Sequence, residues 1–579
     1  MTFKSNTNPM FRSQFSEDIF NFKYAHEADF AGAETWDKLA WTLVNDVCAG
    51  LMPVSEAAQL YEFIRDLKFI PGGRYLYYAG RPHKFFNNCF LFRAEEDSRE
   101  DWANLSWKAE NALMTGGGIG VDYSIYRGEG VPIKKTGGLA SGPIPKMMMI
   151  NEIGRRVMQG GSRRSALYAS LDRLHPDVQK FLTIKDWDQY PVGTTGYTLK
   201  DIKAQDFNFP APLDMTNISV NYKTDWLKPW HWNYLAYRGD DRKKVYVGDH
   251  NDPIFRQNVE QALRTGEPGF SFNFFEKENE TLRNACTEVT SEDDSDVCNL
   301  GSVNMGRIES LEEFRQIVEL GTKFLVCGTL KAQLPFDKIY ETREKNRRLG
   351  LGIMGVHEWL LKRGYRYEVT PELHRWLSVY EIASEKTGRD FADELGISRP
   401  VGFRAIAPTG SIGILAGTTT GIEPLFAVAY KRRYLKGQDQ WYYQYVVDGT
   451  AQELIDVYGL NPESIESAGD LAVDYERRIK FQADVQDYVD HAISSTINLP
   501  AWGSEHNNPD KVDDFARTLA AYAPRLRGFT CYPDGARGGQ PLTHVPYAEA
   551  KAHLGQEFSE AIQTHDICDI SGKGGSCGV

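Results

Sequence analysis

Short apolar runs alternate with amphipathic helical stretches over much of this chain, from residue 71 to about residue 545. The runs at 88–92, 119–123, 270–274 and 403–407 have the length and composition of buried strands. Turns rich in Gly, Ser and Thr separate these runs from stretches with helical periodicity. Strands that alternate with helices in this way predict an α/β body.

Both ends of the chain depart from this pattern. Residues 1–70 show mainly helical periodicity, which ends at the turn Pro71–Gly73. Residues 546–579 finish with four glycines among the last eight positions, which predicts a flexible tail. We therefore expect an N-terminal helical segment (1–70), a main body (71–545) and a C-terminal segment with a flexible tail (546–579).

Composition and charge restrict the classes of function. The chain has 579 residues, 41% hydrophobic and 25% charged, which is enough for a large core. A net charge of −13 argues against a nucleic-acid groove, but it is compatible with a local site for the phosphates of one nucleotide. The sequence shows no signal-peptide pattern and no run of 18 apolar residues. We expect a protein of the cytoplasm, or of a host cytoplasm if it is viral, that binds neither nucleic acid nor membrane.

The cysteines are scattered and include no C-x-x-C pair: Cys48, Cys89, Cys286, Cys298, Cys327, Cys531, Cys568 and Cys577. This scatter disfavours a structural zinc site, and a disulfide framework is not expected in a large unsecreted protein. Cys48 and Cys327 fall in apolar helical patterns and are expected to pack in the core. Redox or catalytic roles remain for a subset of the others.

One thiol lies in the string Asn284-Ala-Cys286-Thr-Glu288. If this string is extended, the three named side chains share one face at steps of about 6–7 Å. A thiol between a hydrogen-bonding amide and a general base suits chemistry on a substrate rich in hydroxyl groups. Cys298, twelve positions after Cys286, could supply reducing electrons nearby.

Three glycine-rich stretches are candidate ligand loops: 114–120, 160–165 and 407–413. In the second, Arg163 and Arg164 suit a phosphate or the edge of a base. The third follows an apolar run and indicates a helix N-terminus that faces an anion. Taken singly, each stretch is equally well explained as a tight turn.

Together these motifs resemble the catalytic subunit of a ribonucleotide reductase, over residues 70–545 and the tail. The resemblance rests on four segments, namely Asn284–Glu288 with the finger-loop pattern N-x-C-x-E, Asn88–Phe90, Cys298–Gly301 and Pro408–Ile412. It implies a ten-stranded α/β barrel, in which two parallel five-stranded halves run antiparallel. The finger loop would thread the centre of this barrel.

The resemblance also implies roles in thiyl-radical chemistry. Cys286 would become a thiyl radical and abstract the 3′ hydrogen of a ribonucleotide, while Glu288 takes the proton of the 3′-hydroxyl and Asn284 holds a ribose hydroxyl. The substrate phosphates would bind the loop of Pro408, Thr409, Gly410, Ser411 and Ile412. A dNTP effector would bind the specificity loop of Gly160, Gly161, Ser162, Arg163 and Arg164. Di- and triphosphate substrates both fit these motifs.

The remaining cysteines receive redox roles from the same resemblance. Cys89 and Cys298 would supply two electrons as a dithiol and become a disulfide. Cys568 and Cys577 on the tail would re-reduce that disulfide by thiol–disulfide exchange, with a thioredoxin- or glutaredoxin-type protein as the external reductant.

The radical source follows from a second comparison of motifs. Thr530 and Cys531 occupy the places where the type with a separate subunit carries two adjacent tyrosines. Their surroundings resemble instead the adenosylcobalamin-dependent type, so we expect adenosylcobalamin as the cofactor. The alternative is a ferritin-like partner subunit with a diiron or dimanganese centre. A glycyl-radical enzyme is disfavoured because Glu288 is present.

Two functions of other classes remain as rivals. A thiol oxidoreductase without radical chemistry would leave Asn284 and Glu288 without a role. An inactive nucleotide-binding protein would have no need of the intact thiols.

The spacing of two glycine motifs bears on assembly. Gly116–Gly120 and Gly137–Pro143 are separated by only sixteen residues, Val121 to Thr136. The monomeric branch of the family carries a long insertion here, which builds its effector site within one chain. A neighbouring chain would therefore complete the dNTP site, and a homodimer is the simplest closed arrangement.

Overall fold

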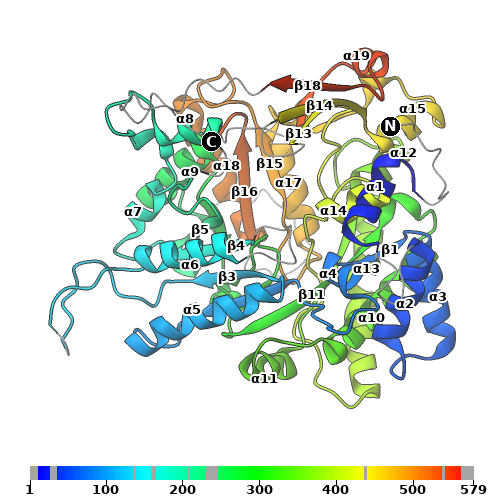
Figure 1. The fold of residues 1–579 in the computed structure, drawn as a ribbon, viewed down its shortest axis with the longest axis horizontal. Helices are drawn as coiled ribbons and strands as arrows, with labels where there is room; N and C mark the ends of the chain where they lie inside the picture. The colour runs from blue at the N-terminus through cyan, green and yellow to red at the C-terminus, as the bar shows by residue number, and fades with distance from the viewer. Residues whose placement is uncertain are drawn as a thin grey trace, which may run out of the picture.

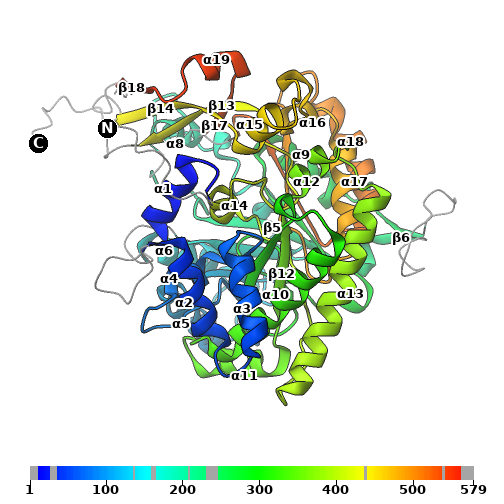
Figure 2. The same cartoon turned by 90° about the vertical axis from the view of Figure 1, so that its right-hand side faces the viewer.

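The computed structural model of this protein describes residues 11–25, 35–134, 137–157, 165–206, 209–229, 246–435, 440–536 and 542–561. Strands lie in the middle of the molecule, helices cover them, and the N-terminal helices pack on one side (Figure 1 and Figure 2). Within these ranges no helix is long and apolar enough to cross a membrane.

Five parallel strands form one half of the sheet. In order of pairing they are β2 (Cys89–Arg93), β3 (Gly118–Asp122), β4 (Leu167–Asp172), β5 (Thr216–Tyr222) and β8 (Gly269–Phe272). Parallel neighbours need crossover connections, and helices supply them: α5 (Arg99–Met114), α6 (Ile144–Arg156), α7 (Val178–Thr183), α8 (Leu199–Gln205) and α9 (Pro253–Thr265). The strands expected at 88–92, 119–123 and 270–274 are confirmed.

The second half contains β11 (Asp296–Asn304), β12 (Leu349–Met354), the segment 403–406, β15 (Thr496–Leu499) and β16 (Gly528–Pro533). The segment 403–406 forms parallel bridges to Leu351 on one side and to Ile493 on the other. It is held by backbone hydrogen bonds, such as the 3.1 Å bond from the Ala405 N–H to the Leu351 carbonyl. In place of the regular strand expected at 403–407, the structure has an extended segment with two isolated bridges.

The two halves meet antiparallel at both seams, because β11 pairs with β2 and β16 pairs with β8. The strands of both halves belong to one ten-stranded sheet, and the isolated bridges of segment 403–406 lie between β12 and Ile493, three residues before β15. This arrangement agrees with the α/β barrel expected from the sequence.

The described part of the N-terminal segment, residues 11–25 and 35–70, is mainly helical. It contains α1 (Gln14–Lys23), α2 (Trp36–Cys48) and α3 (Val54–Arg65), followed by β1 (Phe69–Pro71) and α4 (Gly73–Tyr78). Their apolar faces share one core with α10 (Leu311–Lys331) and α13 (Pro371–Glu394). Cys48 and Cys327 are buried in this core, so their expected role in packing is confirmed.

A four-stranded sheet outside the barrel was not expected from the sequence. Its order is β17 (Leu542–His544), β13 (Ala429–Leu435), β14 (Gln440–Val447) and β18 (Glu557–Ala561), and α19 (Tyr547–Ala552) packs against it. Both Figure 1 and Figure 2 place β14 above α1. The chain also forms the helices α12 (Val356–Lys362), α14 (Gly410–Ala416), α15 (Gly449–Asp456) and α18 (Val512–Tyr522).

Candidate active site

The string 284–288 forms a turn at the tip of a finger, so the expected extended conformation is wrong. The finger rises between two short antiparallel strands, β9 (Leu282–Arg283) and β10 (Thr290–Ser291). The Asn284 carbonyl accepts a hydrogen bond of 2.9 Å from the Thr287 N–H, and Thr287 has a left-handed backbone with φ of 70°. The Asn284 side-chain oxygen accepts a second bond of 2.9 Å from the Val289 N–H. An asparagine that bonds to the following backbone in this way favours a turn over a strand.

Glycines of the loop 114–120 make room for this finger. A Cβ on Gly120 would lie only 1.6 Å from the Arg283 carbonyl oxygen, and one on Gly118 would lie 3.3 Å from the Ala285 Cβ. Gly116 and Gly118 also line the active-site cavity, and the approach of this loop to a ligand stays a prediction. The close packing of Gly120 on the finger was not foreseen.

Arg283 fixes the base of the finger. Its buried guanidinium donates hydrogen bonds to the Asn273 side-chain oxygen (2.8 Å), the Ser271 hydroxyl (3.2 Å) and the Arg527 carbonyl (2.7 Å). Burial lowers the pKa of Arg283 to about 9, so the group stays charged at neutral pH. These bonds join the finger to β8 and to the residue before β16. Sequence reasoning missed Arg283 because its partners are distant in the chain.

Cys89 and Cys298 lie directly opposite one another where β2 meets β11. Side chains on directly opposite residues have Cβ atoms about 4.5–5.5 Å apart, close to the separation that a disulfide needs. Both thiols are buried, and the Asn284 amide donates a hydrogen bond of 3.0 Å to the Cys89 sulfur. Burial, and then the nearby Glu288 carboxyl, raises the pKa of both thiols well above the usual value. Both are therefore protonated at neutral pH.

Glu288 is a buried carboxyl group at the end of the turn. Its exposed fraction is 1%, and its Oε2 atom has no hydrogen-bond partner among the described residues. Burial raises the pKa of Glu288 to about 7, against the opposing effect of the Asn284 amide. A carboxylate with a pKa near the working pH is well suited to act as a general base.

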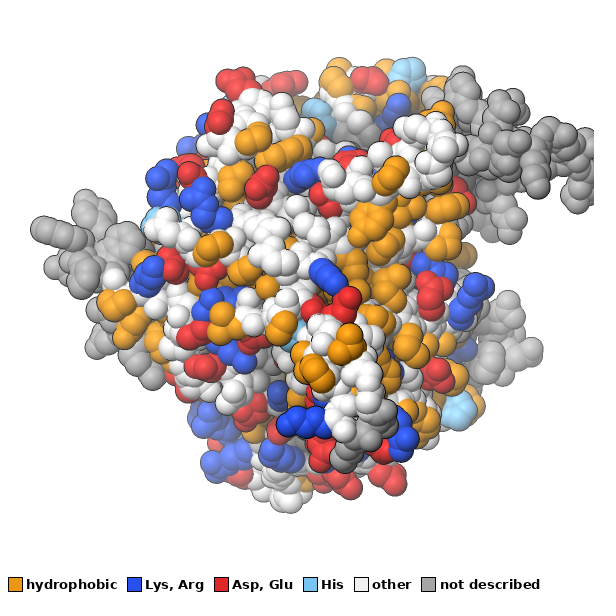
Figure 3. All heavy atoms as spheres, turned by 90° about the vertical axis from the view of Figure 1, so that its left-hand side faces the viewer, with side chains coloured by type: hydrophobic (Ala, Val, Ile, Leu, Met, Phe, Trp, Pro, Cys, Tyr) orange, Lys and Arg blue, Asp and Glu red, His pale blue; other side chains and the backbone are white. Residues whose placement is uncertain are grey.

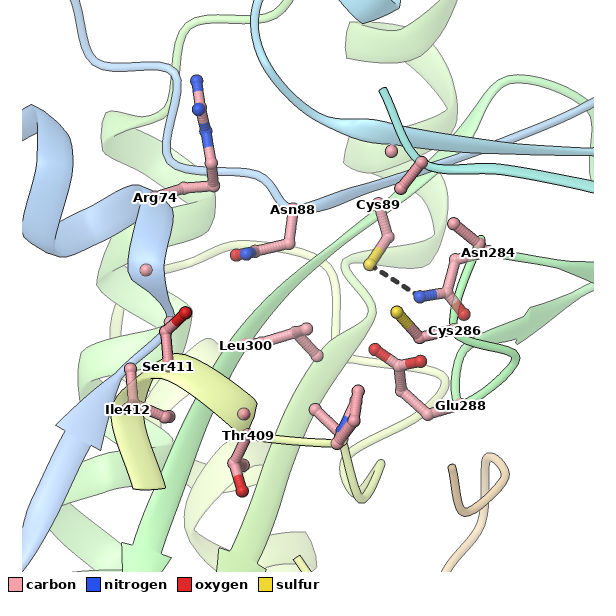
Figure 4. A pocket seen from close by; sticks show the side chains of 18 of the residues that line it. Arg74, Asn88, Cys89, Asn284, Cys286, Glu288, Leu300, Thr409, Ser411 and Ile412 are labelled. Atoms are coloured by element: carbon pink, nitrogen blue, oxygen red, sulfur yellow. Dashed lines mark hydrogen bonds between the residues drawn. The ribbon is translucent and has the colours of Figure 1, made fainter. Parts of the chain in front are cut away.

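One cavity of about 160 Å³ is lined by Cys89, Asn284, Cys286 and Glu288, and Cys298 lies behind this lining as the partner of Cys89 in the sheet. Figure 4 shows Cys286 between Cys89 and Glu288, with Asn284 beside them. Cys286 is half-buried, whereas the other two thiols are fully buried. The opposite wall of the cavity comes from β11 and the start of α14. A half-buried thiol, a carboxyl group that can act as a base, and one thiol of the opposed pair thus line a single cavity.

The loop 408–412 begins helix α14, as expected. Thr409 is the residue before the helix, and its left-handed backbone (φ of 48°) is fixed by a 2.8 Å hydrogen bond from the Gly421 N–H to its hydroxyl. Thr409, Gly410 and Ser411 face the cavity. The first N–H groups of a helix have no partner within it, so they can bind an anion.

Comparison with known proteins identifies this arrangement. The family model of the ribonucleotide reductase barrel domain matches residues 87–376 and 399–532. The chain belongs to the ribonucleotide reductase family. The matched residues include the strands β2 and β11, the finger and the loop that begins α14.

Several relatives are known ribonucleotide reductases. The vitamin B12-dependent ribonucleoside-diphosphate reductase of Mycobacterium tuberculosis is 27% identical over 552 residues, which cover 87% of this chain and 74% of the relative. The enzyme of the same name from Thermoplasma acidophilum is 26% identical over 555 residues, which cover 86% of this chain and 68% of the relative. The ribonucleoside-diphosphate reductase subunit alpha of Synechocystis is 24% identical over 426 residues, which cover 62% of this chain and 55% of the relative.

Some predicted residues of this ribonucleotide reductase lie outside the described ranges. They are the specificity-loop residues Gly160, Gly161, Ser162, Arg163 and Arg164 and the tail cysteines Cys568 and Cys577. Other cavity residues were missed. Asn88 and Arg74 line the cavity, and the Asn88 side-chain oxygen has no hydrogen-bond partner among the described residues. The position of Asn88 next to Cys89 was the available signal.

The strand that would carry a tyrosine pair is β16. Its Cys531 is buried and donates a hydrogen bond of 3.4 Å to the Ala262 carbonyl, and burial raises its pKa to about 12. The Thr530 hydroxyl donates to the Ser495 carbonyl at 3.0 Å. Within the described part of the chain, no group of three or more His, Cys, Asp or Glu side chains is placed to hold a metal ion.

Proposed function

We propose that this chain reduces ribonucleotides to 2′-deoxyribonucleotides by thiyl-radical chemistry that starts at Cys286. The observation that carries the proposal is the cavity lined by the half-buried Cys286, the buried base Glu288 and Cys89, whose direct partner across the sheet is Cys298. Neither rival class accounts for this arrangement. A thiol oxidoreductase without radical chemistry would leave Asn284 and the loop 408–412, which also line this cavity, without a role.

The first half of the reaction uses the finger. The Cys286 thiyl radical removes the hydrogen from C3′ of the ribose, and this forms a thiol and a substrate radical. Glu288 accepts the proton of the 3′-hydroxyl, because its carboxylate lies in the same cavity. The Asn284 amide lies between this base and Cys89, where it orients a ribose hydroxyl.

The second half uses the dithiol. Replacement of the 2′-hydroxyl by hydrogen, with release of water, requires two protons and two electrons. Cys89 and Cys298 supply them when their two S–H bonds are lost and one S–S bond forms. The C3′ hydrogen then returns from Cys286, which regenerates the radical. The overall change is ribonucleotide plus dithiol to deoxyribonucleotide plus water plus disulfide. The high pKa of both buried thiols keeps them protonated until this step.

Adenosylcobalamin, when bound, supplies the oxidising equivalent that converts the Cys286 thiol to a radical. The names of the Mycobacterium and Thermoplasma relatives, which match most of this chain, support this cofactor. Corrin rings carry peripheral amide groups, which form hydrogen bonds with amide and hydroxyl side chains. Such side chains are present beside the finger. Asn217 at the start of β5 is exposed and donates to the Ala285 carbonyl at 3.0 Å. Thr496 and Thr530 form a neighbouring pair of accessible hydroxyls and would hold such amides together with Asn217.

The alternative with a separate ferritin-like subunit has less support. It requires a tyrosine relay toward Cys286, yet Thr530 and Cys531 occupy the matching places on β16. The adjacent pair Tyr442 and Tyr443 lies on β14, in the sheet outside the barrel.

The pH dependence of turnover should report on Glu288. Burial raises the pKa of this carboxyl to about 7, so about a tenth of it is ionised at pH 6 and about nine tenths at pH 8. We expect kcat/KM to rise about tenfold over this range, because only the carboxylate accepts the proton. Glu288→Gln should lose at least about 100-fold in kcat together with this dependence. A wild-type rate that stays level from pH 6 to pH 8 would contradict the assignment.

Cys568 and Cys577 complete the cycle by thiol–disulfide exchange with the cavity disulfide, and a thioredoxin-type protein then reduces them. The sheet strand β18 ends at Ala561, which fixes the point from which the tail extends. Sixteen residues from Ala561 to Cys577 span at most about 55 Å when extended.

A homodimer completes the effector site. Exposed apolar side chains lie on the adjacent helices α5 and α6: Trp107 (49% exposed), Met114 (67%) and Met149 (51%). Figure 3 shows hydrophobic side chains gathered on the side of the molecule where α6 and α7 lie in Figure 1. Gly160–Arg164 follow α6 directly in the chain, so a partner packed on this face can complete a dNTP site.

This interface is testable by sedimentation. The wild type should form a dimer whose association strengthens with dNTP, because a ligand bound across the interface stabilises it by mass action. Met149→Glu should shift the equilibrium to monomer. Ile382→Glu, at a site 65% exposed on α13, is the matched control and should not. A strict monomer that still shows dNTP-dependent substrate choice would disprove the proposal.

The reaction itself is tested by incubating the purified chain with ribonucleoside di- and triphosphates, dithiothreitol and adenosylcobalamin. Chromatography should show 2′-deoxynucleotides, and the rates decide between di- and triphosphate substrates. Product that forms only after addition of a ferritin-like subunit would favour the alternative.

A further inference from the structure

Helix α1 lies along α14, the helix that begins at the proposed phosphate loop. The Arg12 guanidinium donates a 2.9 Å hydrogen bond to the Gly417 carbonyl just after the end of α14, and the Ser16 hydroxyl donates one of 2.7 Å to the Ile414 carbonyl. At the other end, the Lys23 ammonium donates a 2.8 Å bond to the Ser411 hydroxyl. The two helices therefore run antiparallel, and the last residue of α1 lies at the first turn of α14.

A buried ion pair holds this arrangement in place. Arg12 bonds at 2.7 Å to Glu358 of α12, whose side chain is fully buried, and at 3.0 Å to Glu453 of α15. Removing one partner of such a pair is costly, because the other charge is left buried. The contacts of Arg12 therefore hold the start of α1 in place, and the helix positions Lys23 beside the loop.

The phosphate loop contains no cationic side chain of its own to balance the charge of a bound phosphate. Pro408–Ile412 includes no Lys or Arg, and α14 has only seven residues, so its dipole is small. Arg74 also lines the cavity, but its guanidinium donates to the Thr115 carbonyl and lies 4.7 Å from the ring centroid of Tyr78. Tyr24, the neighbour of Lys23, is a lining residue of the same cavity. The α1 end is thus at the rim, next to Ser411.

We propose that Lys23 binds the terminal phosphate of the substrate together with the loop Pro408–Ile412. The inference rests on the proposed function of this cavity and adds a substrate contact from outside the matched barrel residues, 87–376 and 399–532. The ammonium lies 2.8 Å from the Ser411 hydroxyl, so a phosphate held by the loop would come within hydrogen-bond reach of its N–H groups. The N-terminal segment then takes part directly in substrate recognition.

Steady-state kinetics with Lys23→Ala test the proposal. KM for a ribonucleoside diphosphate should rise about tenfold with kcat unchanged, which is the size expected for one charge-assisted hydrogen bond. Lys23→Arg should recover most of the affinity, since it keeps the charge. Lys38→Ala, at an exposed lysine on α2, is the matched control and should behave as wild type. Added salt should raise KM more steeply for wild type than for Lys23→Ala.

Binding separates this proposal from the reaction assignment. Calorimetry should show weaker binding of the diphosphate to Lys23→Ala, and equal binding of the phosphate-free nucleoside to both proteins. Equal diphosphate affinity of the two proteins, or an equal loss for the phosphate-free nucleoside, would overturn the role of Lys23. If the wild type makes no deoxynucleotide, the reaction assignment fails, and these affinities still decide the Lys23 contact.

Discussion

Cys286→Ser is expected to reduce turnover by at least about a thousandfold, to below detection, while the protein stays folded and binds nucleotide. The hydroxyl group is close in size to the thiol, and Cys286 is half-buried in a turn, so little packing is lost. A serine O–H bond is much stronger than a thiol S–H bond, so no radical forms at this position. Product assays and calorimetric nucleotide binding, measured on the same preparation, check both halves of this prediction.

Cys531→Ala is the control for this experiment. Cys531 is buried in β16, where its thiol only packs and bonds to the Ala262 carbonyl. We expect a modest loss of stability, about 1 kcal/mol, with turnover retained. Measurable deoxynucleotide synthesis by Cys286→Ser would remove Cys286 from the radical step.

Cys89→Ser or Cys298→Ser should abolish deoxynucleotide formation at a later step. The Cys286 radical can still abstract the C3′ hydrogen in these variants, but no dithiol remains to donate two electrons. Release of tritium from a 3′-labelled substrate should therefore continue while product is absent. Both sites are buried, and an unpaired hydroxyl there costs about 1–3 kcal/mol.

Cys327→Ser makes the same chemical change at a fully buried site on α10, away from the cavity. It should show a similar loss of thermal stability with turnover retained. Normal product formation by Cys298→Ser would show that electrons enter by another route.

The strands of the first barrel half could be predicted because buried parallel strands leave short, mainly apolar runs, such as residues 88–92. Helix α10 was foreseen from the apolar helical pattern that contains Cys327, and in the structure Ser310 caps it. The start of α14 was foreseen from the apolar run that precedes its glycine-rich turn. Each of these signals is local in the sequence.

The features that were missed depend on contacts between distant segments. The turn at 284–288 needs a left-handed Thr287, which no propensity favours, and the finger fits only because Gly120 has no side chain. Arg283 could not be placed without knowing where β8 and β16 lie. The outer sheet joins strands more than 100 residues apart, β14 and β18, so no periodicity reveals it.

A single-turnover experiment tests the central claim most directly. The Cys577→Ser variant is reduced, freed of reductant and mixed with adenosylcobalamin and a ribonucleotide. We expect about one deoxynucleotide per chain. Peptide mass spectrometry should also find a new disulfide between Cys89 and Cys298, which are paired across β2 and β11. Absence of deoxynucleotide, or product formed while both cysteines remain thiols, would contradict it.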